Sequence, residues 1–298
     1  MHGVVRRVAS EDTAQRLSNI SNILGRITLH AGSIRCYASI FRIIHRVQPE
    51  ECYHLAAESF VGFDVDSTFS TLDTNINGTH YLLSSIQEIV PNCKFYFAAS
   101  SEMFGNASHS PQDENTPFHP RCSYGISKVT GYHLTENYRS QYGLFACSGI
   151  LYNHESPRRS YSFVTRKIVS HAVRIKRGEN IKLRLGNLDA QRDWGHAQDY
   201  IQAMWLMLQQ NQPDDYVVAS GKLHSVRDFV DVVFQRLDLC YQEYVLIDPQ
   251  FFRQADKVPL VGNAQKVRSI LGWNPTYTFD TLIDAMLEAE MESEFNKA

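Results

Sequence analysis

The chain has 298 residues, with 29 lysines and arginines, 32 aspartates and glutamates, and a formal net charge of −3. This balance gives no broad basic field, which excludes a general electrostatic affinity for nucleic acid or anionic membranes. The first residues, MHGVVRRVAS, lack the apolar core of a signal peptide, and no apolar run approaches the ~20 residues that span a bilayer. We therefore expect a cytoplasmic protein with a small-molecule ligand.

The first half of the chain alternates short apolar runs with longer segments of helical period. This alternation is typical of βαβ units and a mostly parallel sheet, so the predicted fold class is α/β. The predicted strands are 2–5, 27–30, 51–56, 94–99 and 144–151, and the predicted helices are 39–47, 68–89 and 123–142.

The second half has a different pattern, because predicted strands become scarce beyond about Tyr152. The predicted helices here are 163–176, 197–209, 225–237, 263–271 and 278–295. We interpret residues 1–152 as a nucleotide-binding domain. Residues 153–298 are interpreted mainly as a substrate-binding lobe, with some segments returning to the sheet of the first domain.

The start of the chain lacks a feature of dinucleotide-binding folds, which open with a strand, a G-x-G-x-x-G or related turn, and a helix whose N-terminus receives the pyrophosphate. Gly3 and Gly25 stand alone, and the first predicted strand runs directly into Arg6 and Arg7. The sequence therefore predicts a sheet without its first strand-turn-helix, roughly 25 residues of a ~30-residue βαβ unit. That strand is central in the 3-2-1-4-5-6 order, so its neighbours would lose a ladder partner.

Tyr124 and Lys128 form a Y-x-x-x-K pair, which lies on one face of a helix. Ser100 and Glu102 follow the strand at 94–99, where ligands bind in open α/β sheets. A phenol with a pKa near ~10 needs its anion stabilised to act as a base at neutral pH, and Lys128 can supply part of that. Ser100 can hydrogen-bond the substrate oxygen that the phenol would deprotonate, and so help to align it. The non-catalytic alternatives are a solvated lysine beside a half-buried tyrosine, and a turn with a capping serine and a surface acid.

Longer segments carry a more specific resemblance. They are AASSEMFG at 98–105, LYNHESPRR at 151–159, FVTRKI at 163–168, LGNLDAQRDWGHA at 185–197 and HSVRDF at 224–229. Together with the Y-x-x-x-K pair, they resemble the GDP-mannose 4,6-dehydratase family of the extended short-chain dehydrogenase/reductase superfamily. The resemblance covers essentially the whole chain after its start. It implies a Rossmann-like doubly wound parallel sheet, truncated at its N-terminus, with a smaller C-terminal α/β substrate lobe.

The resemblance also implies an activity, the NADP-dependent conversion of GDP-mannose to GDP-4-keto-6-deoxymannose. Tyr124 would deprotonate the sugar O4 while hydride leaves C4 for NADP. Glu102 would then remove the C5 proton and help water leave C6, after which the hydride returns to C6 and a protonated group supplies a proton to C5. Ser100, Glu102, Tyr124 and Lys128 are the implied catalytic residues, and no metal is expected because no histidine pair has ligand spacing.

Binding residues are carried over by position. The implied NADP contacts are Arg6 and Arg7 at the 2′-phosphate, Leu55, Ala56, Ala57 and Ser59 under the cofactor, Tyr124, Lys128, His154 and Arg159. The implied contacts to the GDP part of the substrate are Asn153, Lys167, Arg192 and Arg253, and cations are what a diphosphate requires. A salt bridge to Asp193 or Asp199 is the non-functional alternative for Arg192. A homo-oligomer, dimer or tetramer, is also implied.

Two other functions stay open. The first is another GDP-sugar dehydratase, epimerase or 4-ketoreductase on the same scaffold, which a product that keeps its C6 oxygen would favour. The second is a non-catalytic truncated paralogue that binds a full-length enzyme. Purified protein without nicotinamide absorbance would favour this second function.

Overall fold

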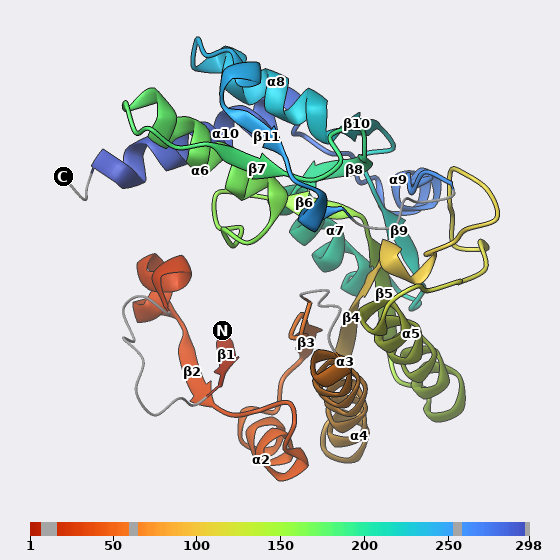
Figure 1. Ribbon diagram of the computed structural model, residues 1–298. Helices are drawn as coiled ribbons and strands as arrows, with labels where there is room; N and C mark the ends of the chain where they lie inside the picture. Colours follow the sequence, from red (N-terminus) through yellow and green to blue (C-terminus); the bar gives the residue numbers. More distant parts are fainter. Residues whose placement is uncertain (7–16, 60–64, 253–257, 296–298) are drawn as a thin grey trace. The chain divides into compact units, whose positions relative to one another are not determined.

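The computed structural model describes residues 1–6, 17–59, 65–252 and 258–295. The chain forms two compact units, whose elements are labelled in Figure 1. The first unit comprises Met1–Met103, Pro120–Gly149 and Met207–Asp215, and the second comprises Phe104–His119, Ile150–Leu206 and Tyr216–Ala298. No helix in the described part of the chain is both long and apolar enough to cross a membrane.

The strands of the first unit run parallel. β1 (His2–Val5) pairs with β2 (Thr28–Ala31), and β3 (Glu51–His54) pairs with β4 (Lys94–Ser100), which is followed in the sheet by β5 (Ala146–Leu151). β4 and β5 are almost wholly buried, as their continuous apolar runs predict for central strands. Parallel strands joined by helices confirm the α/β class.

Three strands of the first unit, β1, β2 and β3, each have an edge without a ladder partner among the described residues. Within the described residues, β1 pairs only with β2, and β3 pairs only with β4. The predicted third strand extended to residue 56, but β3 ends at His54. Leu55 and Ala56 are exposed and lie beyond the strand, so the predicted strand was two residues too long at its end.

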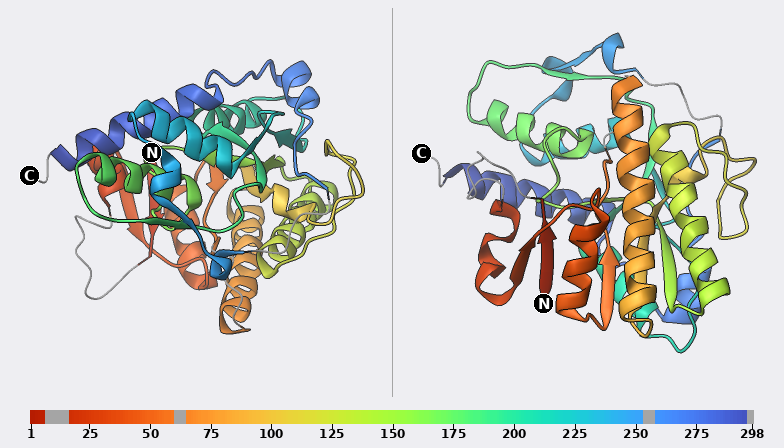
Figure 2. Two further views of the ribbon diagram at one scale, coloured as in Figure 1. Left: turned by 45° about the horizontal axis from the view of Figure 1, so that its top comes forward. Right: turned by 90° about the horizontal axis from the view of Figure 1, so that it is seen from below.

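The helices of the first unit lie close to the predicted positions, except for η1, which was not predicted. They are η1 (Ser18–Arg26), α2 (Tyr37–Val47), α3 (Val65–Leu72), α4 (Gly78–Ile89) and α5 (Ser123–Tyr142). The helix predicted over 68–89 begins earlier and contains a π-helical segment, η2 (Asp73–Asn77), between α3 and α4, which continue one another in Figure 2. α4 packs against both α2 and α5.

The second unit contains more strands than the sequence predicted. They are β6 (Asn153–Glu155), β7 (Leu183–Leu185), β8 (Gln191–His196), β9 (Tyr216–Val218), β10 (Leu223–Ser225) and β11 (Val245–Ile247). β8 lies between parallel β6 and antiparallel β10, while β7 pairs with β11. The expectation of scarce strands was wrong because five of the six have only three residues, too few for an alternating pattern to appear.

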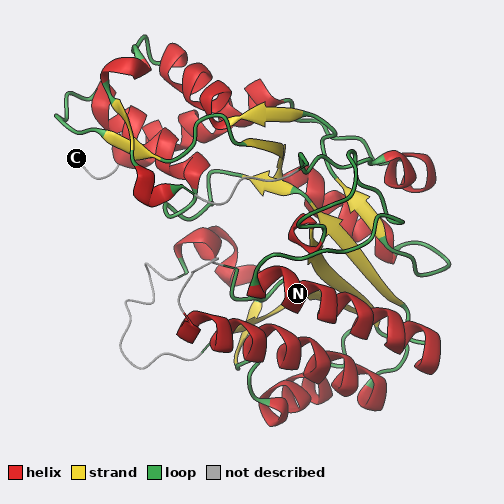
Figure 3. Cartoon of the chain, turned by 45° about the vertical axis from the view of Figure 1, so that its right-hand side comes forward, coloured by secondary structure: helices red, strands yellow, loops and turns green. Residues whose placement is uncertain are grey.

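The second unit has an apolar core and several helices, which Figure 3 draws in red. They are α6 (Val164–Lys176), α7 (Ala197–Leu208), α8 (Val226–Arg236), α9 (Gln265–Leu271) and α10 (Phe279–Phe295), with short turns η4 (Tyr241–Glu243) and η5 (Pro249–Phe251). The core is made by α6, α8 and α10 around Trp194 of β8. α8 starts with a capping box in which Ser225 and Asp228 satisfy each other's backbone N–H groups.

A largely buried ion pair stabilises the first unit, and Asp215→Asn is expected to lower the free energy of unfolding by about 2–4 kcal/mol. Arg139 donates to both Asp215 carboxylate oxygens, at 3.0 and 2.7 Å, and the Ser148 N–H donates to Asp215 at 2.7 Å. Urea unfolding measures the loss. Glu136→Gln, at an exposed pair with His133, is the control, and a loss below about 1 kcal/mol for Asp215→Asn would contradict the assignment.

Candidate active site

The predicted Tyr124–Lys128 pair lies in the first turns of α5. This helix begins after Cys122, whose sulfur accepts the Gly125 N–H at 3.4 Å. Tyr124 is half-buried, whereas Lys128 is only 4% exposed. The Lys128 Nζ lies 5.6 Å from the centroid of the Tyr124 ring, so the structure brings the ammonium and the phenol to one face of the helix.

Lys128 is held against β4. Its Nζ donates to the Ala98 carbonyl at 2.7 Å and lies 4.9 Å from the Phe97 ring centroid. Burial lowers the pKa of Lys128 to about 8. Burial, with a smaller effect of Lys128, lowers the pKa of His54 to about 3, so that imidazole is neutral. A lysine with this pKa changes charge close to physiological pH.

Lys128→Met is expected to abolish the predicted dehydration of the sugar nucleotide. The same change should nevertheless raise the free energy of unfolding at neutral pH. Lowering the pKa from 10.5 to about 8 corresponds to a cost of about 3 kcal/mol for the buried charge. Loss of the donor to Ala98 costs about 1–2 kcal/mol, which leaves a net gain of about 1–2 kcal/mol.

Urea unfolding across pH tests the sign of this effect. Between pH 8 and 10.5 the unfolded wild-type chain keeps the Lys128 proton that the folded chain has released. Wild-type stability should therefore rise with pH through this window relative to that of Lys128→Met. Equal slopes for the two proteins would contradict a buried charge at this position.

Ser100 and Glu102 come from the end of β4 and the turn that follows it, η3 (Ser101–Met103). Ser100 is 9% exposed and its hydroxyl accepts the Glu102 N–H at 3.2 Å, while Glu102 is half-buried. A Cβ on Gly125 would lie 2.7 Å from the Glu102 carbonyl oxygen, so α5 approaches this turn as closely as a glycine allows. The four predicted catalytic residues thus come from two segments in direct contact.

The predicted cofactor residues of the first unit follow the carboxyl ends of strands. Leu55, Ala56 and Ser59 are exposed after β3, and Ala57 is half-buried. Arg6 is exposed directly after β1, while Arg7 lies outside the described residues.

Three predicted residues of the second unit lie on or after β6. Asn153 and His154 are half-buried in the strand. The His154 Nδ1 is 2.8 Å from the Tyr152 carbonyl oxygen, and burial lowers its pKa, which favours the neutral ring. The Arg159 Nε lies 3.1 Å from a carboxylate oxygen of Glu155, which is 2% exposed.

Lys167 and Arg192, which follow β6 in the sequence and are predicted to contact GDP, are both cationic. The Lys167 Nζ donates to the Arg184 carbonyl at 2.6 Å, and an Arg192 Nη donates to the Gln191 carbonyl at 2.6 Å. Arg253 lies outside the described residues. Asp193 and Asp199 were the alternative salt-bridge partners of Arg192, and both accept hydrogen bonds from other residues. The donors to Asp193 are Ser220, Gly221 and Gly262. The donors to Asp199 are Thr276 and Tyr277.

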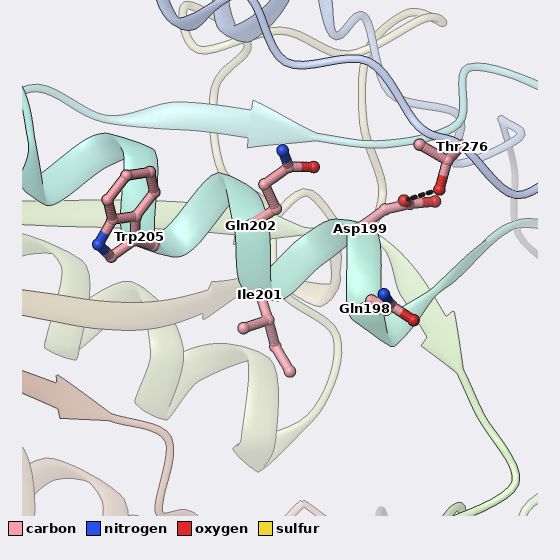
Figure 4. Close-up of a pocket in the computed structure, with 6 residues that line it drawn as sticks. All are labelled: Gln198, Asp199, Ile201, Gln202, Trp205 and Thr276. Carbon is pink, nitrogen blue, oxygen red and sulfur yellow. Dashed lines mark hydrogen bonds between the residues drawn. The ribbon is translucent and has the colours of Figure 1, made fainter. Parts of the chain in front are cut away.

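A pocket in the second unit does not coincide with any predicted site residue. It is lined by Gln198, Asp199, Ile201, Gln202, Trp205 and Thr276, mostly from α7 (Figure 4). Thr276 donates to Asp199 at 2.6 Å there. Over the parts of the chain that the structure describes, no cluster of histidine, cysteine and acidic side chains could hold a metal ion.

Two buried polar residues near the predicted sites were missed. Asn75 bonds to both Glu58 and Ser127, and Glu155 pairs with Arg159. Glu155 stands at the end of β6 and Arg159 in the turn that follows, where a four-residue spacing gives no signal of a pair. Asn75 lies three or four residues from buried positions along its helix, so a polar residue on a core face was the available signal.

Comparisons with known proteins identify the family and the fold of the chain. The family model for GDP-mannose 4,6 dehydratase matches residues 1–286. GDP-mannose 4,6 dehydratase 2 of Arabidopsis thaliana is 44% identical over 303 residues, which cover 98% of this chain and 80% of the relative. In the structure of RMD from Pseudomonas aeruginosa complexed with NADPH, 21% identity accompanies a TM-score of 0.82, with 97% of this chain and 99% of that chain covered.

A dTDP-glucose 4,6-dehydratase from Bacillus anthracis, in complex with NAD, has a TM-score of 0.81 at 21% identity and covers 94% of this chain and 85% of its own. These structures confirm the predicted Rossmann-like α/β fold. By its sequence and its fold, the chain belongs to the GDP-mannose 4,6-dehydratase family.

Proposed function

We propose that the chain converts GDP-mannose to GDP-4-keto-6-deoxymannose and water, with NADP as the cofactor. The observation that carries this proposal is the close association of the Tyr124–Lys128 pair with Ser100 and Glu102 inside one unit. Family membership supports the substrate and the reaction.

The first step would use the Tyr124 phenol. Lys128, when protonated, stabilises the phenolate, which takes the proton from the sugar O4. The Ser100 hydroxyl hydrogen-bonds the same oxygen and aligns it. C4 thereby becomes a ketone carbon, and the proton on C5 becomes acidic because it is α to that carbonyl.

The second step would use Glu102. Its carboxylate takes the C5 proton, and the resulting acid protonates the C6 hydroxyl, which leaves as water. A bound nicotinamide would supply the redox chemistry, taking hydride from C4 and giving it back at C6. The proton that Tyr124 took from O4 balances the proton that has to be added at C5, and its release restores the phenolate. The net change is the loss of one water, without consumption of cofactor.

Cofactor binding is supported by the residues after β3. The segment that begins with Leu55 lies at the carboxyl end of a parallel strand and is largely exposed. Its next two residues, Ala56 and Ala57, have small side chains, so a dinucleotide can approach the backbone there. Arg6 favours the extra phosphate of NADP over NAD. The neighbouring solved structures contain NADPH in one case and NAD in the other, which supports a nicotinamide in general.

Substrate binding would fall to the second unit. Asn153, Lys167 and Arg192 would contact the GDP part, with the two cations facing the diphosphate. His154 and Arg159 would make further cofactor contacts. The family resemblance also supports a homo-oligomer.

The test is to incubate the purified chain with GDP-mannose and either NADP or NAD and to follow the sugar nucleotide by mass spectrometry. We expect a product that has lost one water, with NADP more effective than NAD. A product that keeps its C6 oxygen would favour another GDP-sugar enzyme. Folded protein that carries no nicotinamide and turns over no substrate would favour the non-catalytic paralogue.

A further inference from the structure

Glu155 is a buried carboxylate at the end of β6, and two side chains share one of its oxygens. The residue is 2% exposed. Its Oε2 accepts the Thr165 hydroxyl at 2.8 Å and lies 3.1 Å from the Arg159 Nε. Burial raises the pKa of Glu155, and the positive charge of Arg159 opposes that effect. Because an unpaired charge is costly in the interior of a protein, the charge of Glu155 depends on Arg159.

The guanidinium of Arg159 is held on two sides. Its Nε edge faces Glu155, and its central carbon lies 3.6 Å from the centroid of the Phe163 ring. The backbone is fixed as well, because the Arg159 N–H donates to the Ser156 carbonyl at 3.0 Å in the turn after β6. A guanidinium that is restrained at one edge and on its flat face has a defined orientation.

The opposite end of the same guanidinium remains available. Arginine has five N–H donors, and the contact with Glu155 uses only the one on Nε. Among the residues that the structure describes, neither Nη group of Arg159 has a partner. The two Nη groups form a planar fork that matches two oxygens of a phosphate group, and the side chain is 26% exposed, so an anion can reach it.

A purely structural role would not require a charge at position 155. The Thr165 hydroxyl already joins Glu155 to the first turn of α6, and a neutral glutamine could accept this hydrogen bond equally well. The negative charge therefore acts on Arg159 and not on α6.

We propose that Glu155 and Phe163 are positioning residues, which orient Arg159 so that its Nη groups bind a phosphate group of the nicotinamide cofactor. This proposal rests on the proposed function, since it takes Arg159 as a cofactor contact. A long side chain that is already held in its binding orientation loses less conformational entropy when the ligand binds.

Four variants test this assignment. Glu155→Gln keeps the shape of the side chain but removes its charge, and Phe163→Leu removes the aromatic face. Arg159→Ala removes the fork itself, and the double variant Glu155→Gln/Arg159→Ala measures whether Glu155 acts through Arg159. Isothermal titration calorimetry gives the Kd for NADPH, NADH and GDP, and thermal unfolding gives Tm.

Two further variants are controls. Thr165→Val removes only the hydrogen bond from α6 to Glu155. Glu179→Gln removes a carboxylate that accepts three hydrogen bonds from Arg174 on the exposed surface of the same unit. Both controls should leave the Kd for NADPH within about 2-fold of wild type, although Thr165→Val lowers Tm.

We expect Arg159→Ala to raise the Kd for NADPH by roughly 10–100-fold, because hydrogen bonds to a charged group are lost. Glu155→Gln should raise it by about 10-fold and Phe163→Leu by about 3-fold. In the double variant the Kd should stay within about 2-fold of that of Arg159→Ala, because Glu155 has no fork left to orient. Its Tm should exceed that of Arg159→Ala, which leaves a buried carboxylate without its cation.

The three ligands identify the phosphate group. A higher Kd of Glu155→Gln for both NADPH and NADH would support the proposal and assign the fork to the cofactor diphosphate. A higher Kd for NADPH alone would support it and assign the fork to the 2′-phosphate. Weaker binding of GDP alone would overturn it, since the fork would then face the substrate.

Other results would also overturn the proposal. One is a Kd for NADPH that rises in Arg159→Ala but not in Glu155→Gln. Another is a Glu155→Gln effect that persists at full size when Arg159 is already alanine, because Glu155 would then act through the fold. A wild-type chain that binds NADPH but does not dehydrate GDP-mannose would refute the proposed function alone, and the Kd values would still decide the role of Glu155. A wild-type chain that binds no nicotinamide would overturn both.

Discussion

Tyr124→Phe is expected to lower kcat for loss of water from GDP-mannose by about 10³-fold or more. The change removes the only group of this side chain that can take the O4 proton, while the ring keeps its packing beside Lys128. Because the first step creates the ketone on which the second depends, neither reduced cofactor nor dehydrated product should form. Mass spectrometry of the sugar nucleotide and absorbance of the reduced nicotinamide measure the two.

The control for this prediction is Tyr142→Phe. Tyr142 is the last residue of the same helix and is 56% exposed, so the loss of its hydroxyl should leave kcat within about 2-fold of wild type. A Tyr124→Phe protein that keeps more than about a tenth of wild-type kcat would show that another group accepts the O4 proton.

Glu102→Gln is expected to lower kcat by about 10²–10⁴-fold for a different reason. An amide cannot take the C5 proton, but the Tyr124–Lys128 pair remains intact. C4 oxidation should therefore proceed and water loss should not, so a single turnover would leave reduced nicotinamide together with a 4-keto sugar that still carries its C6 oxygen. Rapid mixing followed by mass spectrometry distinguishes this species from substrate and product.

Glu88→Gln is the matched control for this change. Its carboxylate is on the exposed side of α4, 3.4 Å from the Tyr37 hydroxyl, and its loss should not alter either step. If Glu102→Gln produced neither reduced cofactor nor product, Glu102 would have to act in the first step rather than the second.

The elements that were predicted correctly are those whose sequence pattern is local and extends over many residues. The predicted bounds of α5 are the observed ones, because Cys122 precedes it in extended conformation and Gly143 ends it with a φ of 70°. β4 and β5 were found because their apolar runs are continuous. The short strands of the second unit were missed because their partners, such as β8 for β6 and β10, lie far away in the sequence.

The same distinction applies to the candidate site. The positions of Ser100, Glu102, Tyr124 and Lys128 in the fold could be predicted because they fall within or directly after recognisable elements, and their catalytic roles stay predictions. Asn75 was not predicted, because its bond to Ser127 joins residues that are 52 positions apart. The π-helical turn that places it there adds a residue to a helix, and no periodic pattern predicts such an insertion. The roles of His154, Arg159, Lys167 and Arg192 stay predictions.

The division of the chain into units bears on how such a protein can change over evolutionary time. The backbone passes from one unit to the other five times, and each unit is assembled from three separate stretches. A single break at residue 152 would leave the first unit without Met207–Asp215 and the second without Phe104–His119. Asp215 would be lost with the former, and with it the partner of Arg139. Exchange of either half with that of a relative would therefore separate stretches that pack within the same unit.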